Sequence, residues 1–575
     1  MSTGLADIPA IEAACQAHRD FNTALRVEPP RVRLWMNKAD GSPGLVKRGE
    51  ARDSVNGKFP FKKNTFGTAG TLRLRLDHYL AKWLISIPND PAAKKNVVIT
   101  VDHMGGAFRW SGLLKNWTIT KDAQGIRYLD VTFIDDLQFL QFMLGPPNPL
   151  LPIPVFQFPR VLPMYGPAKW AISMMILINL IRIEGNLWTL PDDPFAVGSW
   201  GSLFNWSSWQ VLIKAKAFDF DDSSTWALLA TRMNRMDSII ADALDDAQLV
   251  MRYRRIITDD GETSDIPGVP NVANGALVLE VVDESGYYSA DGTSLGGGLF
   301  GGFVRSVINF ASGFDEDIAT TVGNSSTIYP DAFYQNGYRG SPPSHPWVVV
   351  RDSIYTSIQT SKLTWSPATA TSVIVGGDNP LADQLAQLFI ESIGSLIGYF
   401  LLGGFSGLGS IASTVIMPFL VGTIAAWLQW KNIGRAHELG WVHLWEIFGQ
   451  GAENNAWSLS AIAAIRSAFM ASKSETAHQF TMGSGGPFLP ALDFHIGSRI
   501  GSTCEIEDVP ALSSLIFVDQ VEEMTLGWDY ANDTPHEYEV TVGQAKAAMS
   551  QSERTARALS KAMTTISNIG VHLTS

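Results

Sequence analysis

Alternation of hydrophobic and polar residues marks the first part of the chain as β-rich. In TLRLRLD, Leu72, Leu74 and Leu76 alternate with two arginines, which is the period of two of a half-buried strand. Further strands are expected at residues 96–102, 108–114 and 127–135, and short helices at 77–85, with Asp77 as its cap, and at 135–144. Residues 30–147 are therefore predicted to form a β-rich domain.

Helical spacing replaces this alternation in residues 148–275. The apolar stretch Trp170–Ile183 is shorter than the ~20 residues that a membrane span requires, so a buried helix is expected. The stretch Ser224–Arg255 has apolar residues at helical spacing with charges between them, and Ser224 can cap it. One or two amphipathic helices are predicted there.

Residue patterns typical of β-strands return in the second half of the chain. The pattern predicts β-structure in residues 276–377 and again in 476–543, a helix at Ala456–Lys473, and a terminal amphipathic helix at Gln544–Ile566. The predicted organisation is an N-terminal arm (1–29), a β-rich domain (30–147), a mixed or helical domain (148–275), a β-rich segment (276–377) with a Gly/Phe-rich insertion (about 296–345), an apolar helical hairpin (378–432), a helical segment (433–475), a C-terminal β domain (476–543) and a C-terminal helix (544–575).

An uncharged run, Ser392–Trp430, is long enough to cross a bilayer. Its glycines and Pro418 predict two short helices, near residues 388–402 and 411–430, with a turn at 403–409. Insertion into a membrane and burial at the centre of an oligomer both fit this pattern. The candidate membrane-contacting residues are Phe389, Ile397, Tyr399, Phe400, Leu401, Phe405, Leu408, Ile416, Phe419, Leu420, Trp427 and Trp430.

A second apolar stretch, Gly298–Phe314, lies in the Gly/Phe-rich insertion and carries a single charge, Arg305. As a helix it would place an apolar face on a membrane surface, and the alternative is a core helix behind a glycine-rich lead. Its candidate membrane-contacting residues are Leu299, Phe300, Phe303, Val307 and Phe310.

Composition narrows the classes of function. A chain of 575 residues exceeds the ~250–300 residues of one core, so several domains are expected. The net charge of −13 argues against a basic nucleic-acid-binding surface. His437 and His443 are not on one helix face, and the two cysteines, Cys15 and Cys504, offer no metal or redox spacing. The sequence predicts no catalytic residues, no metal, no cofactor, no signal peptide and no enzymatic activity.

Several segments of the chain resemble the minor tail proteins, or tail-tip (baseplate) hub proteins, of long-tailed actinobacteriophages, the mycobacteriophage-like siphoviruses. LDHYLAKWL (Leu76–Leu84) and WKNIGRAHELGW (Trp430–Trp441) are the more specific matches. The others are RVRLW at 31–35, RWSG at 109–112, FIDDLQFL at 133–140, GGLFGGFVRSV at 297–307, PWVVVRD at 346–352, ATATSVIVGG at 368–377 and VTVG at 540–543. Together they span roughly residues 30–545.

The resemblance implies an α+β, multidomain fold with two β-barrel-like hub domains flanking helical regions and the apolar helical hairpin. It implies a homotrimer at the distal tip of the virion tail, made in the host cytoplasm and contacting the distal tail protein, other minor tail proteins and the tape measure protein. DNA would pass through the lumen without specific binding, and the hairpin would meet the host membrane.

Three other functions compete with this expectation. A receptor- or glycan-binding tail protein would use surface aromatics, for example around Trp200–Trp209. A cell-wall hydrolase would need a catalytic carboxylate or Cys/His set, and the sequence offers none. A host integral membrane protein is disfavoured, because only one candidate region is present and no clear basic flank orients it.

Overall fold

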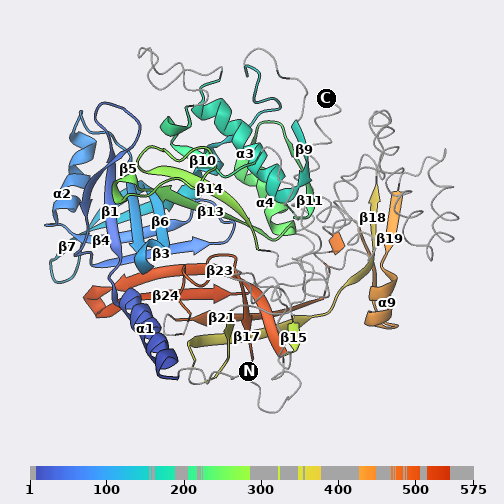
Figure 1. Ribbon diagram of the computed structural model, residues 1–575. Helices are drawn as coiled ribbons and strands as arrows, with labels where there is room; N and C mark the ends of the chain where they lie inside the picture. Colours follow the sequence, from blue (N-terminus) through green and yellow to red (C-terminus); the bar gives the residue numbers. More distant parts are fainter. Residues whose placement is uncertain are drawn as a thin grey trace, which may run out of the picture.

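The computed structural model is β-rich, with several sheets and a smaller number of helices (Figure 1). It describes residues 8–153, 157, 162–187, 205–216, 222, 224–284, 321–323, 348–353, 356–376, 427–448, 468–469, 472, 474–483, 486, 488–504 and 515–543. None of the helices within these ranges has both the length and the apolar character that crossing a membrane requires.

The largest sheet has 14 strands, ordered β17-β21-β24-β23-β3-β4-β7-β6-β5-β1-β2, with β15 and β22 also paired with β23, and β16 paired with β22. Its N-terminal strands are β1 (Arg31–Asn37), β2 (Leu45–Glu50), β3 (Asn56–Lys62), β4 (Ala69–Arg75), β5 (Val97–His103), β6 (Phe108–Lys121) and β7 (Arg127–Asp135). Its later strands are β15 (Thr321–Gly323), β16 (Val349–Val350), β17 (Ile358–Ser366), β21 (Glu475–Met482), β22 (Arg499–Ser502), β23 (Leu515–Asp529) and β24 (Thr534–Val542).

The two ends of the chain meet inside this sheet. Strand β3 pairs antiparallel with β23, so that Phe59 lies opposite Leu526 and Pro60 opposite Thr525. The segments that the sequence divides into a first and a last β domain therefore share one continuous sheet. Among the described strands, β17 and β2 form its free edges, so the barrel-like form expected from the resemblance is not observed.

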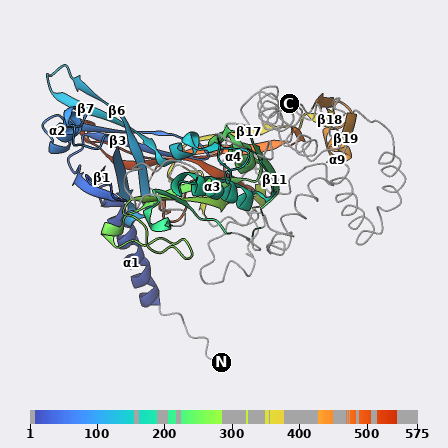
Figure 2. The same ribbon diagram turned by 90° about the horizontal axis from the view of Figure 1, so that it is seen from above.

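A second layer covers part of the large sheet (Figures 1 and 2). It holds the three-stranded sheet β10-β14-β13 and two helices, α3 and α4. Their bounds are β10 (Val211–Ile213), β13 (Leu249–Ile256), β14 (Ala276–Asp283), α3 (Ala168–Glu184) and α4 (Met236–Asp246), and the short pairs β9 (Leu162–Pro167) with β11 (Trp226–Thr231) and β8 (Leu144–Gly145) with β12 (Asn234–Arg235) lie beside them. One continuous core joins this layer to the large sheet, from Phe59 and Trp110 to Ile176 and Leu279.

The helical prediction for Ser224–Arg255 is wrong over most of its length. Only α4 is helical, whereas β11 precedes it and β13 follows it. Apolar side chains of β13 are buried at successive positions, Leu249, Val250 and Met251, because the strand is covered on both faces. A strand buried on both faces loses the alternation that identifies strands in sequence, so helical and strand patterns become hard to separate.

Other helix predictions fare better. The buried helix predicted at Trp170–Ile183 is confirmed as α3, whose residues are buried around most of its circumference. The helix predicted at 77–85 is α2 (Tyr79–Ser86), but its cap is His78, whose side chain accepts a hydrogen bond from the Leu80 amide, and not Asp77. Residues 136–142 form a 3₁₀-helix instead of an α-helix.

Helix α1 (Ile8–Val27) lies in the segment expected as an N-terminal arm and projects from the body of the molecule (Figure 2). Farther away lies a small sheet of β19 (Trp427–Lys431), β18 (Ala370–Gly376) and β20 (Leu444–Phe448), with helix α9 (Ile433–Leu439) beside it. The predicted helix ending at Trp430 is therefore wrong at its C-terminal end, where residues 427–431 pair with β18. The rest of the predicted hairpin lies outside the described residues.

Candidate functional site: a buried charge network

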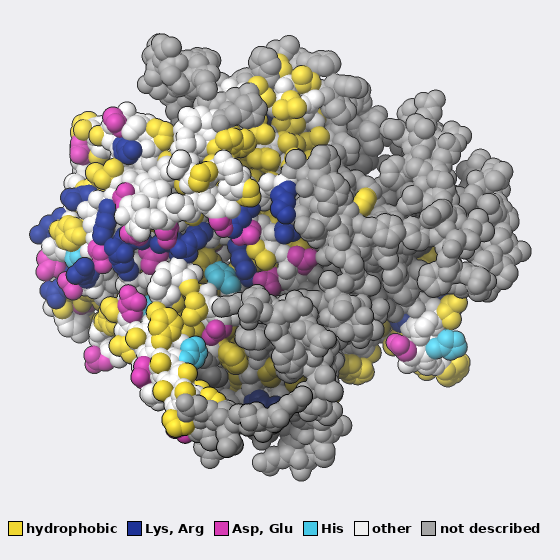
Figure 3. Space-filling view, in the orientation of Figure 1, with side chains coloured by type: hydrophobic (Ala, Val, Ile, Leu, Met, Phe, Trp, Pro, Cys, Tyr) yellow, Lys and Arg dark blue, Asp and Glu magenta, His cyan; other side chains and the backbone are white. Residues whose placement is uncertain are grey.

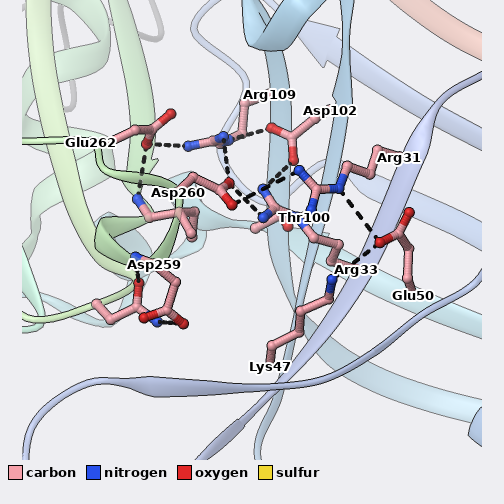
Figure 4. Close-up of polar contacts among 12 residues, drawn as sticks. Arg31, Arg33, Lys47, Glu50, Thr100, Asp102, Arg109, Asp259, Asp260 and Glu262 are labelled. Atoms are coloured by element: carbon pink, nitrogen blue, oxygen red, sulfur yellow. Dashed lines mark hydrogen bonds and ion pairs between the residues drawn. The ribbon is translucent and has the colours of Figure 1, made fainter. Parts of the chain in front are cut away.

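Arg33 on β1 is a fully buried arginine at the point where the second layer meets the large sheet (Figure 4). Its Nη2 donates to Asp102 Oδ2 on β5 at 2.6 Å, and its Nη1 donates to Asp260 Oδ2 at 2.6 Å. Asp260 lies in the loop that follows β13. One guanidinium thus joins the large sheet to the second layer through two charge-assisted hydrogen bonds, which are stronger than neutral ones.

Arg109 on β6 repeats this arrangement from the neighbouring strand. It lies opposite Asp102 in the β5–β6 register, and its Nε donates to Asp102 Oδ1. Its Nη1 donates to Glu262 Oε2 at 2.5 Å and to the Arg255 carbonyl at 2.9 Å. Asp102 therefore accepts from two arginines, one on each strand beside it.

Glu262 closes the network, which we define as Arg33, Arg109, Arg254, Asp102, Asp260 and Glu262. Its Oε1 accepts from Arg254 at 3.0 Å, and its Oε2 also accepts from the Ile257 amide at 2.9 Å. Within this set three guanidinium groups face three carboxylates, and Arg31 adds a longer contact of 3.9 Å to Asp260. The buried charges of Arg33, Asp102 and Arg109 are therefore each compensated.

The electrostatics of the carboxylates agree with this pairing. Burial by itself raises the pKa of Asp260, but the hydrogen bond and positive charge of Arg33 reverse this and hold that pKa below its usual value. Burial likewise raises the pKa of Glu262, and Arg109 lowers it to below the ordinary range. Both carboxylates are consequently held in the ionised form that the network requires.

A second buried pair lies beside the network. Arg255 on β13 donates to both carboxylate oxygens of Asp136, at 2.7 and 2.6 Å, and to the Gly275 carbonyl at 2.7 Å. Asp136 is completely buried and also accepts from the Ser111 hydroxyl. This bidentate pair fixes β13 against β6 and the start of the 3₁₀-helix that follows β7.

The adjacent Asp135 is buried without an arginine partner. It accepts hydrogen bonds from the Gly67 and Thr68 amides at 3.1 and 3.0 Å. Burial raises its pKa to about 7, the Thr68 hydrogen bond opposes the rise, and the charge of Asp136 adds to it.

The arrangement is suited to holding two layers together. Arg33, Asp102 and Arg109 come from the large sheet, and Arg254, Asp260 and Glu262 come from β13 and its following loop. Each charged group of the network is engaged by a partner within it. Figure 3 shows further Lys, Arg, Asp and Glu side chains gathered on the surface over this part of the molecule. We therefore assign the network a positioning role in the fold.

A different feature, on the small sheet, is exposed and apolar. We call it the tryptophan edge, and its members are Ile433, Trp441, Val442, Leu444 and Trp445. Trp441 is 96% exposed and Trp445 is 77% exposed. Large apolar side chains gathered at this level of exposure are typical of contact surfaces.

Few of the candidate site residues predicted from the sequence lie within the described part of the chain. Trp427 and Trp430 lie on β19, and the Trp430 side chain is half-buried. Near the expected aromatic cluster, Trp209 is buried, with its ring 4.4 Å from that of Trp206. The others lie outside the described residues: Leu299, Phe300, Phe303, Val307, Phe310, Phe389, Ile397, Tyr399, Phe400, Leu401, Phe405, Leu408, Ile416, Phe419 and Leu420.

Sequence reasoning missed the network because its members belong to distant segments. No signal marked Arg33 in the sequence, because Arg31, Val32, Arg33 and Leu34 alternate as in a half-buried strand, a pattern that places Arg33 on the solvent face. The partner itself, Asp260, is 227 residues away in sequence and could not be identified from spacing.

Comparisons with known proteins cover most of the chain. Two curated relatives are similar to it: the minor tail protein Gp28 of Mycobacterium phage L5, 28% identical over 85% of this chain and 87% of the relative, and the minor tail protein Gp28 of Mycobacterium phage D29, 28% identical over 91% and 92%.

Among solved structures, the tail protein from Neisseria meningitidis MC58 aligns with a TM-score of 0.39 and 8% identity, covering 90% of this chain and 97% of that one. The 43 kDa tail protein of prophage MuSo2 from Shewanella oneidensis aligns with a TM-score of 0.38 and 8% identity, covering 90% and 99%.

The resemblance to actinobacteriophage minor tail proteins found in the sequence is confirmed by the curated relatives and by a family match. The sequence model of one family matches residues 31–544, which is nearly the whole chain. The chain belongs to the Siphovirus ReqiPepy6 Gp37-like protein family.

Proposed function

We propose that the chain is a structural minor tail protein of a siphovirus virion and has no catalytic role. The proposal rests on the agreement between the ends of the family match and the ends of the large sheet. The family match spans residues 31–544, and the large sheet runs from Arg31 to Val542. The unit shared with the minor tail protein relatives is thus the sheet with its second layer. Buried ion pairs hold these two layers together, which suits a rigid structural part of a tail.

The test is to locate the protein in the particle. An affinity tag placed after Ser575 is detected by gold labelling and electron microscopy of virions, and a nonsense mutant is complemented in trans. We expect gold on the tails of tagged virions. We expect the nonsense mutant to yield tailless or non-infectious particles unless it is complemented. Unlabelled virions that infect normally without the protein would overturn the proposal.

We further propose a place at the distal tip. There a homotrimer would join the distal tail protein, other minor tail proteins and the tape measure protein, and would close the tube until infection. The net charge of −13 supports a lumen through which DNA slides without binding, because like charges repel. Gold at the end of the tail farthest from the capsid is the expected result, and gold along the tube would contradict it.

The apolar insertion is proposed to contact the host membrane during DNA delivery. The strand β19 begins at Trp427, so a deletion that preserves the small sheet has to end at residue 426. Full-length protein and a variant lacking 392–426 are mixed with liposomes and separated by flotation. Flotation of the full-length protein alone is expected, whereas failure of both to float would leave the run as an oligomer seal.

A second candidate function, binding of a host receptor or glycan, is favoured by the tryptophan edge. Aromatic rings exposed on one edge can stack on sugars, and Trp441 and Trp445 are the most exposed tryptophans among the described residues. Binding to isolated host wall polysaccharide is compared for Trp441→Ala, Trp445→Ala and the matched control Trp365→Ala, a 65% exposed tryptophan on β17. Loss in the first two variants alone supports the function, and unchanged binding in all three excludes this surface.

A further inference from the structure

We propose that Asp352, His478 and Cys504 form a zinc-binding site that fastens three strands of the large sheet. One ligand atom from each residue lies within 4.8 Å of the other two: a carboxylate oxygen, an imidazole nitrogen and the thiol sulfur. His478 and Cys504 are buried, and Asp352 is half-buried. The chemistry is that of a site for a borderline-soft divalent cation.

The topology explains why these residues meet although they are far apart in sequence. Strands β16 and β22 run parallel, with Val350 opposite Ser502. Asp352 and Cys504 each follow two residues later, so the two ligands leave the same end of the strand pair. His478 comes from β21 and reaches this end, where its ring contacts Ser502.

Both ring nitrogens of His478 contact a hydroxyl group, and the tautomer decides which of them would bind a metal. His478 Nδ1 lies 2.7 Å from the Ser502 hydroxyl, and Nε2 lies 2.7 Å from the Ser361 hydroxyl. With the proton on Nδ1, Nε2 presents its lone pair toward Ser361 and is the nitrogen that would bind a metal.

Ser361 marks the position between the ligands. Its hydroxyl contacts His478 Nε2 and also forms a hydrogen bond with the Cys504 thiol. A metal bound to Nε2 and the sulfur would displace this hydroxyl or take it as a fourth ligand. Ser361 is exposed on β17, so the position is reached from solvent.

Geometry and charge both suit zinc. Zinc holds sulfur at about 2.3 Å and imidazole nitrogen at about 2.1 Å, so ligand atoms within 4.8 Å need to close in by about 1 Å. A thiolate and a carboxylate supply two negative charges, which a divalent cation neutralises.

The test uses the full chain, freed of metal with a chelator and then titrated with Zn²⁺ against a chromophoric competitor. One zinc per chain is expected, and Co²⁺ in its place should give a thiolate charge-transfer band. Cys504→Ser and Asp352→Asn should each weaken Zn²⁺ binding by at least about tenfold, the scale known even for residues that only support metal ligands. The matched control is Cys15→Ser, which removes the other, exposed cysteine on α1.

Either of two results would overturn the site. One is that wild-type protein, shown to be folded by a cooperative unfolding transition, does not bind Zn²⁺ stoichiometrically. The other is Zn²⁺ binding that survives both Cys504→Ser and Asp352→Asn, or that Cys15→Ser removes equally. Because Asp352 is half-buried, Asp352→Asn keeps the test informative if Cys504→Ser does not fold. None of these readouts depends on where the protein lies in a virion.

Discussion

His103 on β5 and Tyr538 on β24 are joined by a hydrogen bond, with 2.7 Å between Nδ1 and the phenol oxygen. The other ring nitrogen, Nε2, donates to the Glu28 carbonyl at 2.8 Å, so in the neutral ring Nδ1 accepts from the tyrosine hydroxyl. Burial lowers the pKa of His103 to about 4, and the nearby His536 adds to the effect.

Acid should weaken the fold through this histidine. The folded-state pKa of about 4 lies below the ordinary histidine value of 6.5, so its stabilising contribution is present above pH 6.5 and is lost as the pH falls toward 4. The loss is on the order of 3 kcal/mol in the free energy of unfolding. Urea unfolding at pH 7 and pH 4.5 should show a smaller acid-induced loss for His103→Gln than for wild type. The exposed His18 on α1 supplies the control, and equal losses in wild type and His103→Gln would contradict the prediction.

Asp135 should act in the opposite direction. Its folded-state pKa is raised to about 7 from 3.8, so its contribution is complete below pH 3.8 and is lost as the pH rises through 7. Asp135→Asn removes this dependence and keeps one oxygen for the amides that the carboxylate accepts from. The difference in unfolding free energy between variant and wild type should shift in favour of the variant between pH 5 and pH 8, by about 3 kcal/mol. A difference that is constant across this range would show that Asp135 ionises normally.

Removing one partner of the Arg255–Asp136 pair should destabilise the fold more than replacing both partners with apolar residues. Both side chains are buried, so Arg255→Met leaves an uncompensated carboxylate and should lower the unfolding free energy by about 3–5 kcal/mol. The double variant Arg255→Met/Asp136→Leu removes both charges and should recover much of the loss. Denaturant unfolding of the single and double variants measures the coupling. Additive losses would mean that the pair does not act as a unit.

Gly497 should tolerate no side chain. Its φ is +81°, and a Cβ there would lie 2.1 Å from Val250 Cγ2 on β13. Gly261 has the same φ of +81° but nothing within 4 Å of an added Cβ, which makes it a matched control. Gly261→Ala should cost only the left-handed backbone strain of about 1–2 kcal/mol, and Gly497→Ala should cost more. Equal melting temperatures for the two variants would show that the Val250 contact yields easily.

Much of the first β-rich segment could be predicted from its sequence, because strands such as residues 69–75 have one buried and one polar face. Prediction failed for β13, where burial on both faces removes the alternation, and for β19, where an uncharged run favoured a helix. Pairings such as β3 with β23 depend on contacts between distant segments, which periodicity does not record. The charge network and the Asp352, His478 and Cys504 cluster were missed for the same reason.

The pairing of β3 with β23 has a consequence for synthesis. Roughly 460 residues separate the two strands, and ribosomes add about 5–20 residues per second. The partner strand β23 is therefore synthesised about 20–90 s after β3. During that time one edge of β3 is open to pairing with another chain. Lys58, Pro60 and Lys62 in β3 are residue types that discourage such pairing. These residues should therefore limit aggregation through β3 while the nascent chain is still incomplete.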